Sequence, residues 1–184
     1  SGSGTSLTTG SYNTFLGTNS GSSVTSGTNI TLVGASSGTS TTIGNNNVML
    51  GTDSGYNNLI GNNLTFIGYQ SGYTQTSVDD NVFVGSQSGY SNSSGSDLIF
   101  IGKEAGYNNT SGNSSIYIGN GTGSNASGFN NETGSRNVYI GSETGVDGVS
   151  STDNVFLGFG AGKANLESEN IFIGSYSGNS NTTG

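Results

Sequence analysis

The chain has 184 residues, of which 29% are hydrophobic and 8% are charged, and its formal net charge is −8. It contains no Cys, His or Trp, which excludes disulfide bonds, zinc–thiolate sites and catalytic arrangements of the Ser-His-Asp or Cys-His kind. Its only cations are Lys103, Arg136 and Lys163, so it lacks the basic surface that binding to nucleic acids or anionic membranes requires. No apolar run approaches the roughly 18–20 residues that span a bilayer.

A short sequence unit recurs along the whole chain, and its most regular mark is a glycine that follows a short apolar run. The first seven leading glycines are equally spaced, and their interval is the one from Gly17 to Gly34. The last three follow after a longer step, a step of the original length and a slightly shorter step. A second glycine stands four residues after each leading one, from Gly21 to Gly178, and includes Gly123 in the seventh unit. The leading glycines are Gly17, Gly34, Gly51, Gly68, Gly85, Gly102, Gly119, Gly141, Gly158 and Gly174.

The three residues before each leading glycine predict one short strand per unit. The first is Thr, Val or Ile in every unit, the second is mostly aromatic, and the third is Leu, Ile or Val. Such residues suit a pleated strand, and runs this short that are bounded by glycine favour strands over helices. In chain order the predicted strands cover residues 14–16, 31–33, 48–50, 65–67, 82–84, 99–101, 116–118, 138–140, 155–157 and 171–173.

One such unit cannot bury a core alone, whereas stacked units can. The sequence therefore predicts an all-β fold, a parallel β-solenoid (β-helix or β-roll) of about ten 17-residue coils, with residues 1–184 as a single repeat domain. The glycines are expected at corners, where a positive φ or a close backbone approach is required. The segment "TTG" at 8–10 and again at 182–184 places both ends in the same phase, which suggests part of a longer fibre or a module that stacks end to end.

The second strand position forms an aromatic row whose direction the pattern leaves open. Successive strand residues face opposite sides, so if the first and third positions fill the interior, the aromatic residues point outward. Soluble monomers rarely expose such a stripe. Either the row faces the interior, or it is buried between chains, and the second arrangement is favoured. The proposed inter-chain stripe consists of Phe15, Phe66, Phe83, Phe100, Tyr117, Tyr139, Phe156 and Phe172.

Units such as "GYNNTSGNSSIYIGNGTG" and "NVFVGSQSGYSNSSG" resemble a repeat of bacterial and phage tail-fibre-like proteins, many of which end in an endosialidase-type chaperone domain. More distantly, the "NVFLG" strand resembles the "SVAIG" strand of trimeric autotransporter adhesin heads, although those heads have small residues where this chain has aromatic ones. The resemblance implies a β-solenoid located outside the cell, at a cell surface or on a virion or phage fibre. It also implies association with other copies, as a trimer or an end-to-end filament.

Two segments are candidates for recognition. Tyrosines follow the second glycine in four successive units and predict a stacked row on one edge, which is interpreted either as a glycan-contact strip or, preferably, as a structural corner. The longer step from Gly119 to Gly141 predicts a bulge at 120–135, which is either a recognition loop or a tolerated insertion. The tyrosines are Tyr56, Tyr73, Tyr90 and Tyr107.

No residue pattern predicts a metal, a cofactor or a catalytic group. The acidic residues are scattered and lack the regular spacing of a calcium-binding repeat, so they are interpreted as solvated charges. The leading hypothesis is a structural fibre shaft that assembles with other copies and is not an enzyme. The alternative is an adhesin rod that binds glycans or a receptor. An ice-binding solenoid ranks lower because its row of threonines is broken at Val48, Val82 and beyond.

Overall fold

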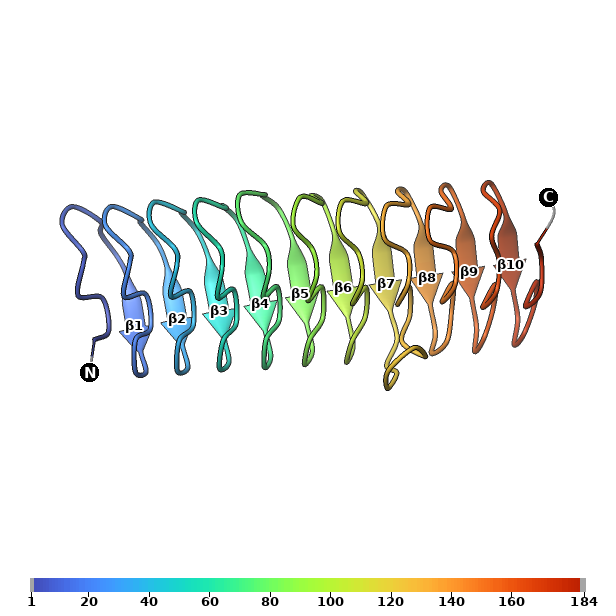
Figure 1. Cartoon of the computed structure of the whole chain (residues 1–184), viewed down its shortest axis with the longest axis horizontal. Helices are drawn as coiled ribbons and strands as arrows, with labels where there is room; N and C mark the ends of the chain where they lie inside the picture. Colours follow the sequence, from blue (N-terminus) through green and yellow to red (C-terminus); the bar gives the residue numbers. More distant parts are fainter. Residues whose placement is uncertain (1, 183–184) are drawn as a thin grey trace.

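The computed structural model describes residues 2–182 and shows a rod of stacked coils, each carrying one short strand (Figure 1). The second "TTG" segment lies mostly outside these residues. All described regular structure is β-strand. The strands are β1 (Thr14–Leu16), β2 (Thr31–Val33), β3 (Val48–Leu50), β4 (Thr65–Ile67), β5 (Val82–Val84), β6 (Ile99–Ile101), β7 (Ile116–Ile118), β8 (Val138–Ile140), β9 (Val155–Leu157) and β10 (Ile171–Ile173).

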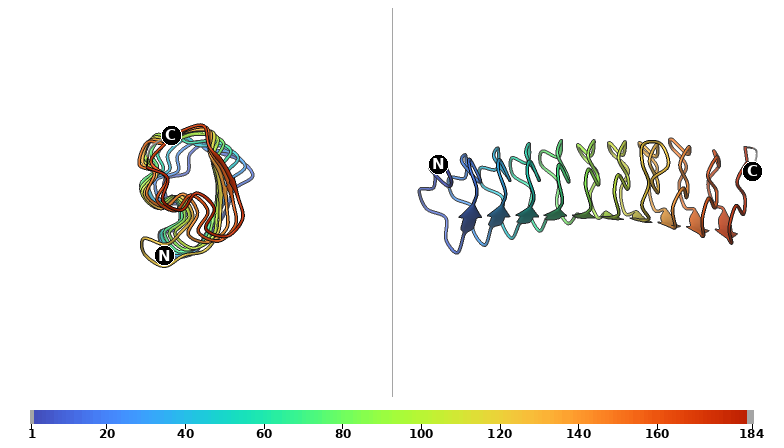
Figure 2. Two further views of the ribbon diagram at one scale, coloured as in Figure 1. Left: turned by 90° about the vertical axis from the view of Figure 1, so that its right-hand side faces the viewer. Right: turned by 90° about the horizontal axis from the view of Figure 1, so that it is seen from below.

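The ten strands form a single parallel sheet in which each strand pairs with the next one along the chain. Equivalent positions face each other, so that Phe83 of β5 lies opposite Phe100 of β6. Seen along the rod the coils nearly superimpose, and seen from below the strands line one side of it (Figure 2). The prediction of a parallel β-solenoid with a 17-residue repeat is thereby confirmed.

Hydrogen bonds between neighbouring coils continue outside the sheet. The Gly21 N–H donates to the Ser37 carbonyl over 3.0 Å, and the Thr25 N–H donates to the Thr42 carbonyl over 2.9 Å. The same positions repeat these bonds in later coils, as in Gly38 to Ser54. The turns therefore satisfy their backbone groups through the adjacent coil, although they have no regular secondary structure.

The leading glycines occupy corners that only glycine tolerates. Their φ angles lie between 120° and 141°, except at Gly119, which precedes the long unit. A Cβ atom on Gly85 would also lie 2.4 Å from the carbonyl oxygen of Gly102 in the next coil. The second glycine has a different role, because a Cβ on Gly89 would lie 2.5 Å from the ring of Phe83. It provides the space in which the core ring packs.

The aromatic row faces the interior of the coil, so the prediction of an outward stripe buried between chains is wrong. Six of its rings are fully buried within one chain, together with Leu32 and Met49 at the same position, and only the two terminal rings are partly exposed. From the fourth coil onward, successive ring centroids lie 4.7–5.1 Å apart. The row consists of Phe15, Phe66, Phe83, Phe100, Tyr117, Tyr139, Phe156 and Phe172.

The glycine-rich turns explain why the large side chains lie inside. These turns contribute little side-chain volume to the centre of the coil. A flat aromatic ring that lies against the second glycine fills this centre to the packing density of protein interiors. The smaller aliphatic residues at the first and third strand positions consequently face outward. Burial raises the pKa of the Tyr117 and Tyr139 phenols, which therefore stay uncharged in the core.

Buried asparagines connect neighbouring coils beside the ring row. Asn81 donates from Nδ2 to the Gly95 carbonyl over 2.8 Å and accepts from the Leu98 N–H over 2.9 Å. In the coils on either side an aliphatic residue, Leu64 or Leu98, occupies the same position. One amide thus satisfies two backbone groups of the following coil, while the alternating aliphatic side chains remain in the apolar core.

We expect Phe83→Ala to lower the free energy of unfolding by about 3–5 kcal/mol, because it removes a fully buried ring from the stack. Val84→Ala, on the outward face of the same strand, should cost less than about 1 kcal/mol. Urea denaturation of the two variants measures both effects. A larger loss for Val84→Ala would contradict the observed orientation of the strands.

Asn81→Leu should destabilise the fold although leucine fits the same position in both neighbouring coils. The change leaves the buried Leu98 N–H without its acceptor, which costs about 1–3 kcal/mol. Amide hydrogen exchange should accelerate at Leu98 and stay slow at Leu64, whose N–H bonds to the unchanged Asn47. Equal exchange at Leu98 in the two proteins would show that the amide is dispensable.

Candidate functional site

The first and third residues of the ten strands form two outward columns, here called the outer sheet face. Three of these twenty residues are threonines and the others are Val, Ile or Leu, with no charged residue among them. Ile101 and Leu157 expose 37% and 44% of their surface. The columns are residues 14, 31, 48, 65, 82, 99, 116, 138, 155 and 171, and residues 16, 33, 50, 67, 84, 101, 118, 140, 157 and 173.

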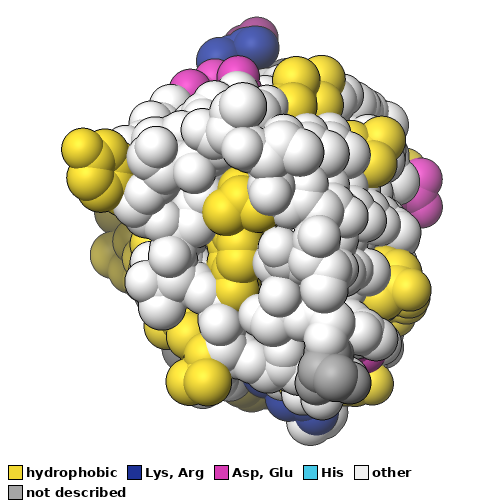
Figure 3. Space-filling model, turned by 90° about the vertical axis from the view of Figure 1, so that its left-hand side faces the viewer, with side chains coloured by type: hydrophobic (Ala, Val, Ile, Leu, Met, Phe, Trp, Pro, Cys, Tyr) yellow, Lys and Arg dark blue, Asp and Glu magenta, His cyan; other side chains and the backbone are white. Residues whose placement is uncertain are grey.

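This face is comparable in area to the largest apolar patch of a typical soluble monomer. Nine coil-to-coil steps of about 4.8 Å and a width of about 10 Å across the strands give an area of roughly 450 Å². Patches of this size on soluble proteins commonly serve as contact surfaces. An end view of the rod likewise shows hydrophobic side chains at several places along its rim as well as in its centre (Figure 3).

The four tyrosines identified in the sequence form a stacked row that continues into a fifth ring. The centroids of Tyr56, Tyr73, Tyr90 and Tyr107 lie 5.0–5.2 Å apart, and Phe129 follows at 5.2 Å. The repeat pattern does not place Phe129 in this row, because the insertion shifts it five residues out of phase. Its place in the row also shows that Gly128, not Gly123, is the second glycine of the seventh coil, since a Cβ there would lie 2.5 Å from the Tyr117 ring.

The stacking bears on the glycan interpretation of the row. A sugar ring packs on the face of an aromatic ring, and both faces of Tyr73 and Tyr90 are covered by neighbouring rings. Burial, followed by the nearby phenol of Tyr90, raises the pKa of Tyr73. Neutral stacked rings with only their edges outward favour the structural interpretation of this row.

The extra residues of the long unit occupy positions 120–124, at the start of the predicted 120–135 bulge. The Gly121 N–H still bonds to the Lys103 carbonyl of the preceding coil at 3.4 Å, whereas the Asn125 carbonyl accepts from the Glu143 N–H of the following coil at 3.1 Å. The intervening residues project from the rod beside β7 (Figures 1 and 2). A Cβ on Gly121 would lie 2.2 Å from the Ala126 nitrogen, so the two ends of the loop approach each other closely at this glycine.

The loop encloses an open hollow of about 500 Å³, here called the insertion notch. One wall consists of Lys103, Asn120, Gly121, Thr122 and Asn125, and the other consists of Ser142 and Glu143. Lys163 lies behind the second wall, with its Nζ atom 2.6 Å from Glu143 Oε2. Two of the three cations of the chain thus lie at the one long interruption of its regular repeat.

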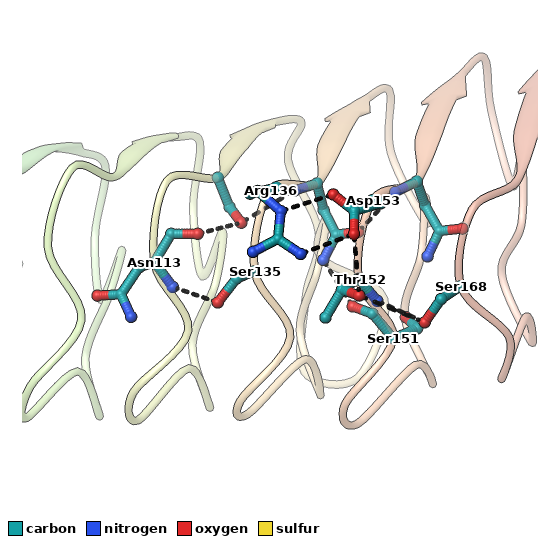
Figure 4. A network of polar contacts seen from close by, with 10 residues as sticks. Asn113, Ser135, Arg136, Ser151, Thr152, Asp153 and Ser168 are labelled. Atoms are coloured by element: carbon teal, nitrogen blue, oxygen red, sulfur yellow. Dashed lines mark hydrogen bonds and ion pairs between the residues drawn. The ribbon is translucent and has the colours of Figure 1, made fainter.

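Arg136, the third cation, does not line the notch. Its Nε and Nη2 atoms donate to the two carboxylate oxygens of Asp153 in the next coil, over 2.6 and 2.7 Å (Figure 4). The N–H groups of Asn113 and Thr152 donate to the hydroxyl oxygens of Ser135 and Ser168, which extends the same row of contacts between coils. Both arginine and aspartate are exposed, and they have left-handed φ angles of 58° and 60°. The pair is a structural contact rather than part of a site.

Comparison with known proteins found no matching family model, curated protein or solved structure. The resemblance to tail-fibre-like proteins and adhesin heads therefore rests on the repeat units and on the solenoid fold. Within residues 2–182, no three acidic side chains lie close enough together to hold a metal ion. In the same part of the chain, no helix has the length and apolarity needed to cross a membrane.

Arg136→Ala should raise the pKa of Asp153 towards its ordinary value, because hydrogen bonds from Arg136 hold it lower. A carboxyl group whose pKa is lowered by folding stabilises the fold above its unfolded pKa, and this contribution is lost as the pH falls through the folded pKa. NMR titration of the Asp153 carboxyl carbon measures the shift. Arg136→Lys should restore part of it, since a lysine keeps the charge but not the paired geometry. An unchanged titration in Arg136→Ala would contradict the assignment.

Proposed function

We propose that this chain is a structural segment of a fibre outside the cell, a stiff rod that holds the parts attached to it at a fixed distance. The observation that carries the proposal is the continuity of the parallel ladder through ten coils, with two aromatic rows beside it. The parallel ladder, the interior ring row and the outer tyrosine row all run along the same axis. Bending or stretching the rod disrupts several of these rows at once.

The two irregular units support a mechanical role. The long unit between Gly119 and Gly141 loops out positions 120–124, and β7 and β8 remain paired in the common register. The short unit between Gly158 and Gly174 leaves β9 and β10 equally well aligned, with their core rings opposite each other. Changes in unit length are thus absorbed in the turns, so that the shaft stays continuous.

The outer sheet face supports assembly with further copies of the same chain. A second copy presents the same two aliphatic columns with the same spacing, so the side chains of the two sheets can interdigitate along their whole length. Such a contact removes about 900 Å² in total, below the about 1,200–2,000 Å² of stable specific interfaces and in the range of weak association. Each chain carries a net charge of −8, so we expect association to strengthen as salt screens the repulsion.

A light-scattering mass combined with negative-stain electron microscopy tests both parts of this proposal. The wild type should form rods with a mass that is a multiple of 18.4 kDa. The double variant Val84→Lys/Ile101→Lys places two charges on the outer sheet face and should yield single chains. The matched double variant Ser77→Lys/Ser94→Lys adds the same charges at exposed turns of the same coils and should assemble like the wild type.

The outcomes separate the rod from its assembly. Rods with the mass of one chain at every salt concentration would rule out the contact between copies while leaving the shaft intact. Compact or irregular particles would rule out the shaft itself. An ice-binding role gains no support from the outer sheet face, because threonine occupies it only at Thr14, Thr31 and Thr65.

A further inference from the structure

The insertion notch has the polar chemistry of a small binding site. The notch brings together a lysine, two amides, two hydroxyl groups and a carboxylate. Its volume of about 500 Å³ lies within the range of about 300–1,000 Å³ of small-molecule sites.

The hydrogen bonds within the protein leave the notch rich in donors. The Asn120 side-chain oxygen accepts from the Lys103 N–H over 2.9 Å, and the Asn125 side-chain oxygen accepts from Lys163 Nζ over 3.4 Å. Both amide oxygens are therefore occupied. The two amide NH₂ groups bond to no other described residue, so they remain free to donate to a ligand.

The charges around the notch tolerate an anion better than the acidic remainder of the rod does. Lys103 exposes 47% of its side chain and lies 3.3 Å from Glu104, and Lys163 pairs with Glu143, so the four charges balance. Glu104 is itself buried, and its Oε2 atom has no hydrogen-bond partner. The Lys103 ammonium has three donor hydrogens and only this one ion pair, which leaves hydrogens available to an incoming acceptor.

From this arrangement we propose that the insertion notch binds a carboxylate-bearing sugar of one or two rings. The carboxylate of the sugar pairs with Lys103, and its ring hydroxyl oxygens accept from the amide NH₂ groups of Asn120 and Asn125. The hydroxyl groups of Thr122 and Ser142 donate or accept as the sugar requires. The walls contain no aromatic or large aliphatic side chain, which disfavours an apolar ligand. The stacked tyrosine row takes no part.

Titration with a galacturonic acid disaccharide, followed by NMR shifts or calorimetry, tests the proposal. Asn125→Asp and Asn120→Asp each keep the oxygen that the protein uses and replace the free NH₂ group by a carboxylate oxygen. We expect either change to weaken binding at least about tenfold, because the sugar loses a hydrogen bond and its carboxylate meets a repelling charge. Ser114→Asp, an exposed position whose equivalents are Asp80 and Asp97, adds the same charge away from the notch and should bind like the wild type.

Three further outcomes would each overturn the proposal. These are the absence of binding by the wild type at millimolar sugar, equal binding of the neutral galactose disaccharide, and equal binding of inorganic sulfate, which would indicate a simple anion site. Unchanged affinity in both amide variants would also overturn it. The assay does not depend on assembly, so its result stands apart from that of the proposed fibre function.

Discussion

The coil-to-coil backbone hydrogen bond is the interaction on which the rest of this structure depends. It fixes the spacing of neighbouring coils at about 4.8 Å and satisfies the backbone of turns that have no regular secondary structure of their own. At that spacing a side chain at a leading glycine would collide with the backbone of the next coil, as at Gly85. The high glycine content, which in isolation suggests a flexible chain, is thus a requirement of tight stacking.

Register converts each position of the repeat into a row of like residues. Aromatic rings at two positions form stacks with centroids 5.0 Å apart, one inside the coil and one at its edge. Such rows stabilise the rod, but they also use up the ring faces that would otherwise contact a ligand. The same regularity spreads aliphatic side chains over the outer sheet face, where they are uncovered in a single chain. The ring stacks and the exposed aliphatic face therefore follow from one geometric cause.

The insertion shows where a structure of this kind acquires mixed chemistry. Most rows of the regular repeat bring like residues together, whereas the insertion brings a lysine, amides, hydroxyl groups and a carboxylate to one place. At residues 120–124 the chain bonds first to the preceding coil and then to the following one, and the hollow between these contacts holds unlike groups. Lys103, Asn125 and Glu143 come from three consecutive coils and line the same hollow.

The sequence by itself determined the period, the strands and their parallel order, because β-branched and aromatic residues before a glycine recur at a constant step. It did not determine which side of the strand lies inside, since alternation defines two faces. The glycine-rich turns leave space at the centre of the coil, and the face that carries Phe83 has the large side chains that fill this space. Three further features came from the tertiary structure. These are the assignment of Gly128 instead of Gly123 as the second glycine of the seventh coil, the place of Phe129 in the outer ring row, and the notch itself. All three depend on where the inserted residues rejoin the hydrogen-bond ladder, and that point is decided by packing against the neighbouring coils rather than by local sequence.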